Sequence, residues 1–306
     1  MAIINTGFTE AGLRSEFQDA FESASKSTIW QDIVTVLKSD KDEEKYAWMG
    51  SVPQLREWGT GRVARPLFSE SYSIKNLKYE STIEVDRDEI SDDQIGSIRM
   101  RTRALGDRAA GHKDKLIADL LVNGATAGFN AYDGKTFFAT DHQSGNSGAQ
   151  SNDITSAAVI PGAPTVAEIK TAIKAGFKTL MGLADDQGEP MNLSTTGLMA
   201  VTPPEVFIDF SEALQAQTIN ATQNVLAGAA RVVAFSRITV PSVFYLLKTD
   251  VAVRPFILQD REPLEFHAME QNSDEGFMRE KFFYGVRARY RLTYGLWQHA
   301  VRITFV

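Results

Sequence analysis

The sequence has 306 residues, of which 39 are acidic and 32 basic, giving a formal net charge of −7 at pH 7. Gly and Pro number only 22 and 10, which excludes a collagen-like chain, and no apolar run reaches the ~18 residues of a membrane-spanning helix. The absence of cysteine excludes disulfides, thiolate metal sites and cysteine nucleophiles, and the acidic balance disfavours tight binding to phosphate backbones. Because the first residues show no secretory signal, we expect a soluble chain made in a reducing compartment.

The N-terminal part is predicted to hold one amphipathic helix and then a long irregular segment. Apolar residues recur at helical spacing over 8–24, and a helix of this length must pack on another surface to be stable. The charged run 38–45 predicts an exposed loop. Residues 46–68 carry two tryptophans among several glycines and prolines, a composition that excludes long regular elements.

Strand periodicity follows this segment. Apolar residues fall on even positions at Tyr72 and Ile74, and on odd positions from Leu77 to Val85. The slip at Lys75-Asn76 predicts a turn or bulge between two strands. Residues 46–90 are therefore predicted to form an extended arm that contains a β-hairpin.

The clearest predicted element is a long helix over 91–124. Ser91 or Asp92 would cap its start, and Asn123-Gly124 would end it. Apolar and small residues repeat every three or four positions along one side, forming a predicted inward stripe of Ile95, Ile98, Thr102, Leu105, Ala109, His112, Leu116 and Leu120. At ~1.5 Å per residue such a rod is long for a globular domain.

A second region is predicted after a surface loop over 143–156. Thr165-Val-Ala-Glu168 is a capping box that opens a helix, and Thr202-Pro-Pro-Glu205 reads as another. Short apolar or alternating runs predict strands over 198–201, 231–235, 243–247, 264–268 and 277–292. The mixture indicates an α+β fold without a βαβ rhythm.

One candidate for chemistry is a phosphate-binding loop at Gly128-FNAYD-Gly134-Lys135-Thr136. Such a loop needs four residues between its glycines and a strand before it, whereas this segment has five and follows a helix. An Asp-Gly turn is the favoured interpretation.

A second candidate comprises Asp133, Asp141 and His142, with Ser144 and Ser147 nearby. The serines lack the G-x-S-x-G elbow of a hydrolase, and no third metal ligand stands at a suitable spacing, so a polar loop with a hydrogen-bonded histidine is favoured. The other histidines, at 112, 267 and 299, are predicted to be core or interface residues.

The final predicted strand carries alternating arginines. Arg287, Arg289 and Arg291 face away from its apolar side and are predicted to pair with carboxylates across an interface. No catalytic, cofactor or metal site is predicted, so the remaining evidence about function is the predicted shape of the subunit. Extended segments with large apolar side chains and an overlong helix need partners, which favours an assembly protein over an enzyme.

The residues YAWMGSVPQLREWGTGR (46–62), YSIKNLKYESTIEVDRDEISDD (72–93) and AYDGKTFFATDH (131–142) resemble the major head (capsid) subunit of Mu-like phages and prophages. The resemblance covers most of the chain in the right order. It implies the HK97-like capsid fold, with an N-terminal arm, an extended loop, a spine helix, and peripheral and axial domains. Mapped onto this chain, these parts are an arm at 1–45, an extended loop (β-hairpin) at 46–90, a peripheral domain at 91–160 with its spine helix at 91–124, an axial domain at 161–255, and a return to the peripheral sheet at 256–306.

The function that the resemblance implies is a non-enzymatic shell subunit of the virion. Its hexamers and pentamers would enclose double-stranded DNA, assembling in the host bacterial cytoplasm with a scaffold, a maturation protease and a portal. Contacts between subunits are expected at Trp48, Leu55, Trp58, Arg62 and Leu67. Two alternatives stay open: an enzyme around Lys135, Asp141 and His142, and a cellular nanocompartment shell of the same fold.

Overall fold

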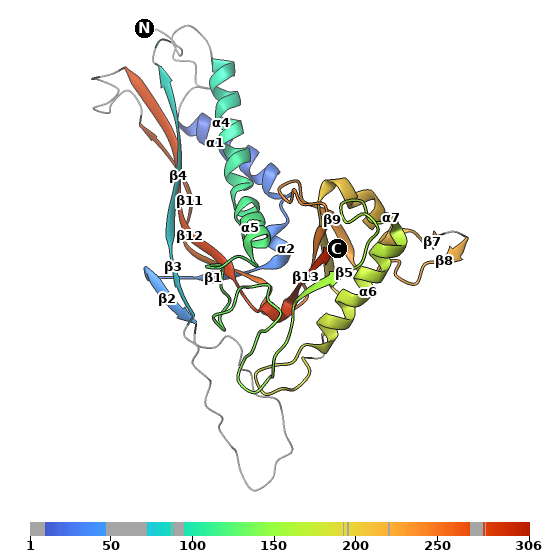
Figure 1. The fold of residues 1–306 in the computed structure, drawn as a ribbon. Coiled ribbons are helices and arrows are strands. Elements are labelled where there is room, and N and C mark those ends of the chain that lie inside the picture. The colour runs from blue at the N-terminus through green and yellow to red at the C-terminus, as the bar shows by residue number, and fades with distance from the viewer. Residues whose placement is uncertain are drawn as a thin grey trace.

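A computed structural model describes residues 10–46, 72–86, 88, 95–191, 193–194, 196–219, 221–269, 278 and 280–306. These residues form two units, an elongated one built on a four-stranded sheet and a rounder one built on a five-stranded sheet (Figure 1). The predicted α+β class is confirmed. In the described part of the chain, no helix has the length and apolar character needed to span a membrane.

The first unit is the elongated one. Its sheet has the order β1-β11-β12-β4, in which β1 is parallel to β11 and the other pairs are antiparallel. A two-stranded ribbon, β2–β3, lies at one end of it (Figure 1). The elements of the first unit are α1 (Glu10–Ser25), α2 (Trp30–Ile33), β1 (Val34–Lys38), β2 (Glu43–Tyr46), β3 (Tyr72–Lys75), β4 (Leu77–Asp86), α4 (Ile95–Ala110), α5 (His112–Asn123), β11 (Phe256–Met269) and β12 (Lys281–Tyr294).

The predicted N-terminal helix is confirmed as α1, and the surface that it packs on belongs to its own chain. Leu13 and Phe17 of α1 are fully buried against α4 and against aromatic residues of β11 and β12. A small residue of α4, Gly106, lets the two helices approach closely, because a Cβ there would lie 2.7 Å from the carbonyl oxygen of Phe17. Burial of two large apolar side chains gives α1 the tertiary stabilisation that its length requires.

The predicted long helix is divided into α4 and α5 at Gly111. Backbone hydrogen bonds still run through the division, from Gly111 N–H to the Asp107 carbonyl and from Lys115 N–H to the Gly111 carbonyl. From Ile98 to Leu105 the predicted stripe is buried, but after Gly111 the most buried residues are Ile117, Ala118 and Leu121. Leu116 and Leu120 of the predicted stripe are only partly buried.

The predicted hairpin between residues 72–75 and 77–86 is wrong. β3 pairs with β2, whereas β4 pairs with β12, so the two strands belong to different sheets. Asn76 marks the break: its backbone N–H donates to the Asp42 carbonyl, and its buried side chain donates to the Lys41 carbonyl at 2.9 Å. The charged run 38–45, predicted to be a loop, supplies β2.

The second unit is a five-stranded sheet with the order β5-β13-β10-β6-β9, one face of which is covered by α6 and α7. The opposite face of the sheet packs toward the first unit, so the two units share one continuous core. The elements of the second unit are β5 (Asp153–Ser156), α6 (Val166–Gly182), β6 (Leu198–Thr202), the 3₁₀ turn η1 (Pro204–Val206), α7 (Phe207–Gln215), β7 (Thr218–Ile219), β8 (Thr222–Gln223), β9 (Arg231–Ala234), β10 (Val243–Lys248), the 3₁₀ turn η2 (Trp297–His299) and β13 (Ala300–Phe305).

Of the two predicted capping boxes, one is confirmed and one is wrong. The Thr165 hydroxyl accepts from Glu168 N–H while the Glu168 carboxylate accepts from Thr165 N–H, which closes the box at the start of α6. Thr202 instead ends the buried strand β6, and η1 follows it without a side-chain cap. Sheet pairing thus places the threonine where its hydroxyl has no helical N–H to bind.

Two of the predicted segment assignments differ from the observed sheets. Residues 256–306 were expected to return to the sheet of the first unit, and β11 and β12 do so, but β13 joins the second sheet between β5 and β10. The predicted surface loop 143–156 ends in a strand, β5, at the edge of that same sheet. In both cases a short segment pairs with strands that are distant in the sequence: β13 with β5 and β10, and β5 with β13.

Candidate functional site

The glycine-rich segment around Lys135 folds as a tight turn rather than a phosphate cradle. Gly134, at a φ of +79°, donates its N–H to the Ala131 carbonyl, and the N–H of Lys135 donates to the Asp133 carboxylate at 3.2 Å. Residues 130 and 136 pair across the turn. These backbone donors are therefore used inside the turn, and the predicted Asp-Gly turn is confirmed.

The side chain of Lys135 is also engaged. Its Nζ lies 2.5 Å from Oδ2 of Asp141, and both side chains are largely exposed. The hydrogen bond with Asp141 raises the pKa of Lys135, and the same bond lowers the pKa of Asp141. The pair behaves as a charged surface contact that closes the turn.

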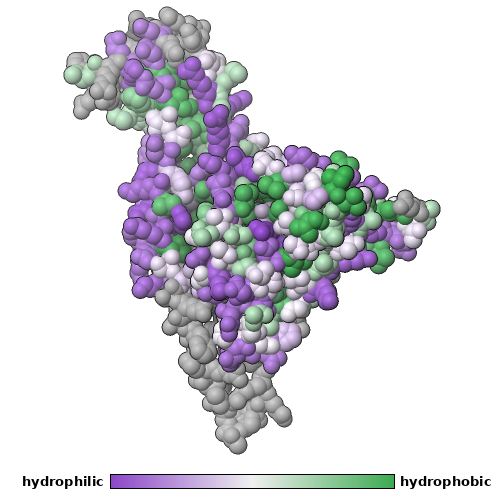
Figure 2. Space-filling view, in the orientation of Figure 1, coloured by the Kyte–Doolittle hydropathy of each residue, from purple (hydrophilic) through white to green (hydrophobic). Residues whose placement is uncertain are grey.

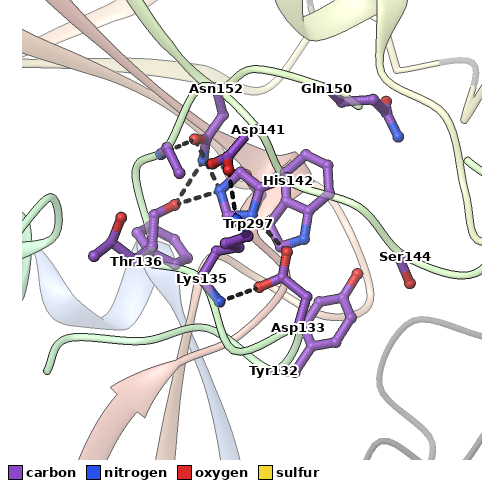
Figure 3. Close-up of polar contacts among 12 residues, drawn as sticks. Tyr132, Asp133, Lys135, Thr136, Asp141, His142, Ser144, Gln150, Asn152 and Trp297 are labelled. Atoms are coloured by element: carbon purple, nitrogen blue, oxygen red, sulfur yellow. Dashed lines mark hydrogen bonds and ion pairs between the residues drawn. The ribbon is translucent and has the colours of Figure 1, made fainter. Parts of the chain in front are cut away.

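A buried polar cluster centred on His142 lies beneath this turn (Figure 3). The Nδ1 atom of His142 is 2.6 Å from Oδ2 of Asp133, and neither side chain is exposed to solvent. Nε2 lies 3.2 Å from both the Phe137 carbonyl oxygen and Oδ1 of Asn152. Because both of these atoms are acceptors, Nε2 carries a hydrogen and donates it.

Two further contacts fix the cluster. The imidazole of His142 stacks on the indole of Trp297, with ring centroids 4.1 Å apart and an interplanar angle of 4°. Asn152 donates to the carbonyl oxygens of Phe137 and Trp297 and accepts from Ala139 N–H, which fixes the orientation of its amide. The cluster therefore ties residues 133–152 to the turn that precedes β13.

This geometry does not support a hydrolytic site at His142. A general base must offer a ring nitrogen to the nucleophile, whereas both nitrogens of His142 bind other groups. The Ser147 hydroxyl accepts from Ser144 N–H and donates to the Gly148 carbonyl. The prediction of a hydrogen-bonded histidine is confirmed, but its setting is a buried cluster and not a polar surface loop.

The remaining histidines differ in their surroundings. His112 lines the space between α5 and β12 and bonds Tyr290 at 2.6 Å, and burial lowers its pKa. His299 is buried, and this desolvation lowers its pKa to about 4 although its ring bonds the Val253 carbonyl. His267 is exposed beside Glu265, which contradicts the core position of the prediction and leaves the interface position as a prediction. Among the described residues, no group of three or more His, Asp or Glu side chains is placed to hold a metal ion.

The arginines of β12 bind carboxylates, but within the chain. Arg287 lies 2.9 Å from Glu262 on the neighbouring strand, and Arg289 binds both Asp42 and Glu262. The prediction that these arginines pair across an interface is therefore corrected for Arg287 and Arg289. Their contacts instead join the loop before β2 to the sheet of the first unit.

The predicted contacts between subunits, at Trp48, Leu55, Trp58, Arg62 and Leu67, lie outside the described residues. The structure does describe the two strands that flank their segment. Tyr46 and Tyr72 face each other on β2 and β3, and their hydroxyls bond Gln259 and Thr293 on the sheet of the first unit. The residues on either side of 47–71 are therefore held in a pair of strands that is bonded to the sheet of the first unit.

Sequence reasoning missed the large apolar side chains that the second unit exposes. Figure 2 shows hydrophobic surface gathered on this unit, whereas the sheet of the first unit is mostly hydrophilic. Val225 is 90% exposed, Val159 87% and Ile208 71%. The capping-box pattern at residues 202–205 did predict a helix that begins just before Ile208, but only the packing of α7 shows which of its sides is uncovered.

Comparisons with known proteins agree with this architecture. A family model described as the Mu-like prophage major head subunit gpT matches residues 8–164 and 237–304. The chain is 29% identical over 297 residues to the Mu-like prophage FluMu major head subunit of Haemophilus influenzae, covering 95% of this chain and 71% of that protein. It is 26% identical over 291 residues to the major capsid protein of Escherichia phage Mu, covering 95% of this chain and 70% of the relative.

Solved structures share the fold. The procapsid of bacteriophage JBD30 matches with a TM-score of 0.55 and 24% identity, covering 97% of this chain and 76% of that one. The capsid of cyanophage P-SCSP1u matches with a TM-score of 0.61 and 12% identity, over 92% and 88% of the two chains. A virus-like particle from Pyrococcus furiosus matches with a TM-score of 0.54 and 10% identity, over 95% and 97%.

Proposed function

The chain belongs to the family of Mu-like prophage major head subunits, and from that membership we propose that its copies close into an icosahedral shell of hexamers and pentamers around double-stranded DNA. It is a major capsid protein with the HK97-like fold. The observation that carries the proposal is the apolar surface of the second unit, because isolated soluble subunits rarely leave such side chains uncovered. A symmetric assembly covers them.

The two units correspond to the two domains that this proposal requires. The first unit would be the peripheral domain, with α4 and α5 as its spine, and the second unit would be the axial domain around the symmetry axis of each ring. The first unit also contains α1, α2, β1 and β2 of the predicted arm and β3 and β4 of the predicted extended loop, so these elements would belong to the peripheral domain. The net charge of −7 suits a wall that encloses DNA without binding it tightly, since bound phosphates would hold the packaged genome back.

The role is structural and non-catalytic, and it places the protein in the virion. Assembly would take place in the bacterial cytoplasm with a scaffold, a maturation protease and a portal. A nanocompartment shell of the same fold is the second candidate, supported by the likeness to the virus-like particle. The nucleic acid content of particles from cells separates the two, because only the phage head would hold double-stranded DNA.

The expected result for the purified protein is a population of megadalton particles with closed shells. Size-exclusion chromatography followed by electron cryomicroscopy measures this directly. A monomer or dimer that binds nucleotide through Lys135 at concentrations that favour assembly would contradict the shell and restore the enzyme.

Segment 47–71 is expected to be protected by assembly. Unassembled subunits should be cut by trypsin after Arg56 or Arg62, whereas assembled particles should resist, because a neighbouring subunit would cover the tryptophans of this segment. Trp58→Ala should lower the particle yield and leave the circular dichroism spectrum of the subunit unchanged. Lys26, in a described exposed turn, is the internal control for trypsin activity. Equal resistance in verified monomers would mean that the segment folds onto its own chain.

A further inference from the structure

Two helices of the second unit present opposite charges to solvent. Both cover the same face of the five-stranded sheet, but α6 packs on β5 and β13 whereas α7 packs on β9. Since β5 and β9 are the two edges of that sheet, α6 lies nearer one edge and α7 nearer the other, and the two helices pack side by side (Figure 1). Both helices also fall between the two segments that the family model matches, so the family match gives them no role.

The uncovered side of α6 is basic. Lys174 and Lys178 are exposed and Lys170 is partly so; the three lysines repeat every fourth residue and so form one stripe, which borders the buried Ile169, Ile173 and Phe177. Met181, at 47% exposure, extends the stripe by one turn. None of the three lysines forms an ion pair with any residue that the structure describes. We call these four residues, Lys170, Lys174, Lys178 and Met181, the lysine face.

The uncovered side of α7 and its preceding turn is acidic. Glu205 and Glu212 are exposed and Asp209 is partly so, and residues 204–215 contain no basic side chain. Ile208 stands among these carboxylates with 71% of its surface exposed. In the described part of the chain, none of the three carboxylates has an ion-pair partner. We call these four residues, Glu205, Ile208, Asp209 and Glu212, the carboxylate face.

The two faces match each other in both charge and composition, since each has three like charges and one large apolar side chain. No ion pair joins them within the described chain, although α6 and α7 are neighbours, so their natural counterparts lie on another molecule. Rings of identical subunits are held by heterologous contacts, in which two different faces of one subunit meet those of its neighbours. We propose that the lysine face of one subunit docks on the carboxylate face of the next subunit around each ring.

A second copy of this chain would cover both the lysine face and the carboxylate face, whereas DNA would cover only the lysine face. Phosphates would neutralise the lysine face, but they would leave Ile208 uncovered and would be repelled by the carboxylates beside it. A neighbouring subunit covers both faces at once and repeats the contact around the ring. This inference rests on the proposed shell function and adds the surfaces through which the axial units meet.

Charge reversal tests the contact from both sides. The first variant carries Lys174→Glu and Lys178→Glu, the second carries Asp209→Lys and Glu212→Lys, and a third combines all four changes. Each of the first two should lower the particle yield at least about tenfold at low salt, because like charges then face each other in every contact. The combined variant should recover a yield within about twofold of the wild type.

Mixing the first two variants gives a sharper result. One variant has two acidic faces and the other two basic faces, so complementary contacts form only where the two alternate around a ring. Alternation closes in a ring of six and fails in a ring of five. The equimolar mixture should therefore yield six-membered rings by native mass spectrometry, but no closed icosahedral shells, which need five-membered rings.

The controls separate this inference from the function on which it rests. Lys26→Glu with Lys41→Glu makes the same change of charge on exposed positions of the first unit and should leave assembly unchanged. Circular dichroism of each variant verifies its fold. Wild-type protein that forms no shells contradicts the proposed function. If the wild type forms shells and either reversed variant also assembles normally, the inference is wrong and the proposed function stands. The same holds if the combined variant fails to recover the particle yield. If reversal of the lysines leaves the shells normal but removes their DNA, the inference is also wrong, and the lysine face contacts DNA instead of a neighbouring subunit.

Discussion

Asp133→Ala is expected to lower the free energy of unfolding of the unassembled subunit by about 3–5 kcal/mol, the usual cost of removing one partner from a buried polar pair. The change leaves His142 fully buried, with Nδ1 deprived of the carboxylate that lies 2.6 Å away. Urea denaturation followed by far-UV circular dichroism measures the loss.

Asp141→Ala is the matched control for this prediction. Asp141 lies in the same loop and pairs with Lys135, but both side chains are largely exposed, and exposed pairs contribute about 0–1 kcal/mol. Asp133→Asn should fall between the two, because an amide keeps one hydrogen bond to the ring. Equal effects of the two alanine substitutions would show that the buried cluster does not hold the turn in place.

Gly106→Ala should destabilise the first unit by about 1–3 kcal/mol, the cost of overpacking a close contact. The added Cβ would lie 2.7 Å from the Phe17 carbonyl oxygen and 3.1 Å from the Cβ of Ala20, and a backbone atom cannot rotate away. α1 must therefore shift from α4, which loosens the packing of Leu13 and Phe17. Denaturation of the unassembled subunit measures the change.

Gly96→Ala in the same helix should act in the opposite direction. No atom lies within 4 Å of a Cβ added there, so the better helix propensity of alanine should stabilise the subunit by about 0.5–1 kcal/mol. The opposite signs separate steric conflict from helix propensity. If both substitutions stabilise the subunit, α1 does not pack on α4 as described.

Local signals in the sequence predicted the helices well, because helical hydrogen bonds and caps involve neighbours in the chain. The capping box at Thr165 and the stripe from Ile98 to Leu105 are examples. Beyond Gly111 the register of the stripe moved, since the break changes which side of the helix faces the sheet. A glycine in a helical pattern was the available signal for that change.

The strands were harder to predict because their partners are distant in sequence. The alternation around Asn76 correctly indicated an interruption, but nothing local shows that β3 and β4 join different sheets. The first half of β11 was missed for the same reason. The polar composition of the loop around His142 suggested exposure, whereas hydrogen bonds with Asp133, Phe137 and Asn152 allow the ring to be buried. Charge periodicity on α6 was visible in the sequence, but its lack of partners was not.

The position of β13 has a consequence for synthesis on the ribosome. This strand, residues 300–305, lies inside its sheet between β5 and β10, although translation reaches it long after both of them. Until it emerges, β5 and β10 each present an unpaired edge, and the side chains that β13 contributes to the core are missing. The second unit thus completes its fold only after almost all of the described chain has been made. Chains that stop before residue 300 lack β13, and we expect them to be excluded from a growing shell because their second sheet stays incomplete.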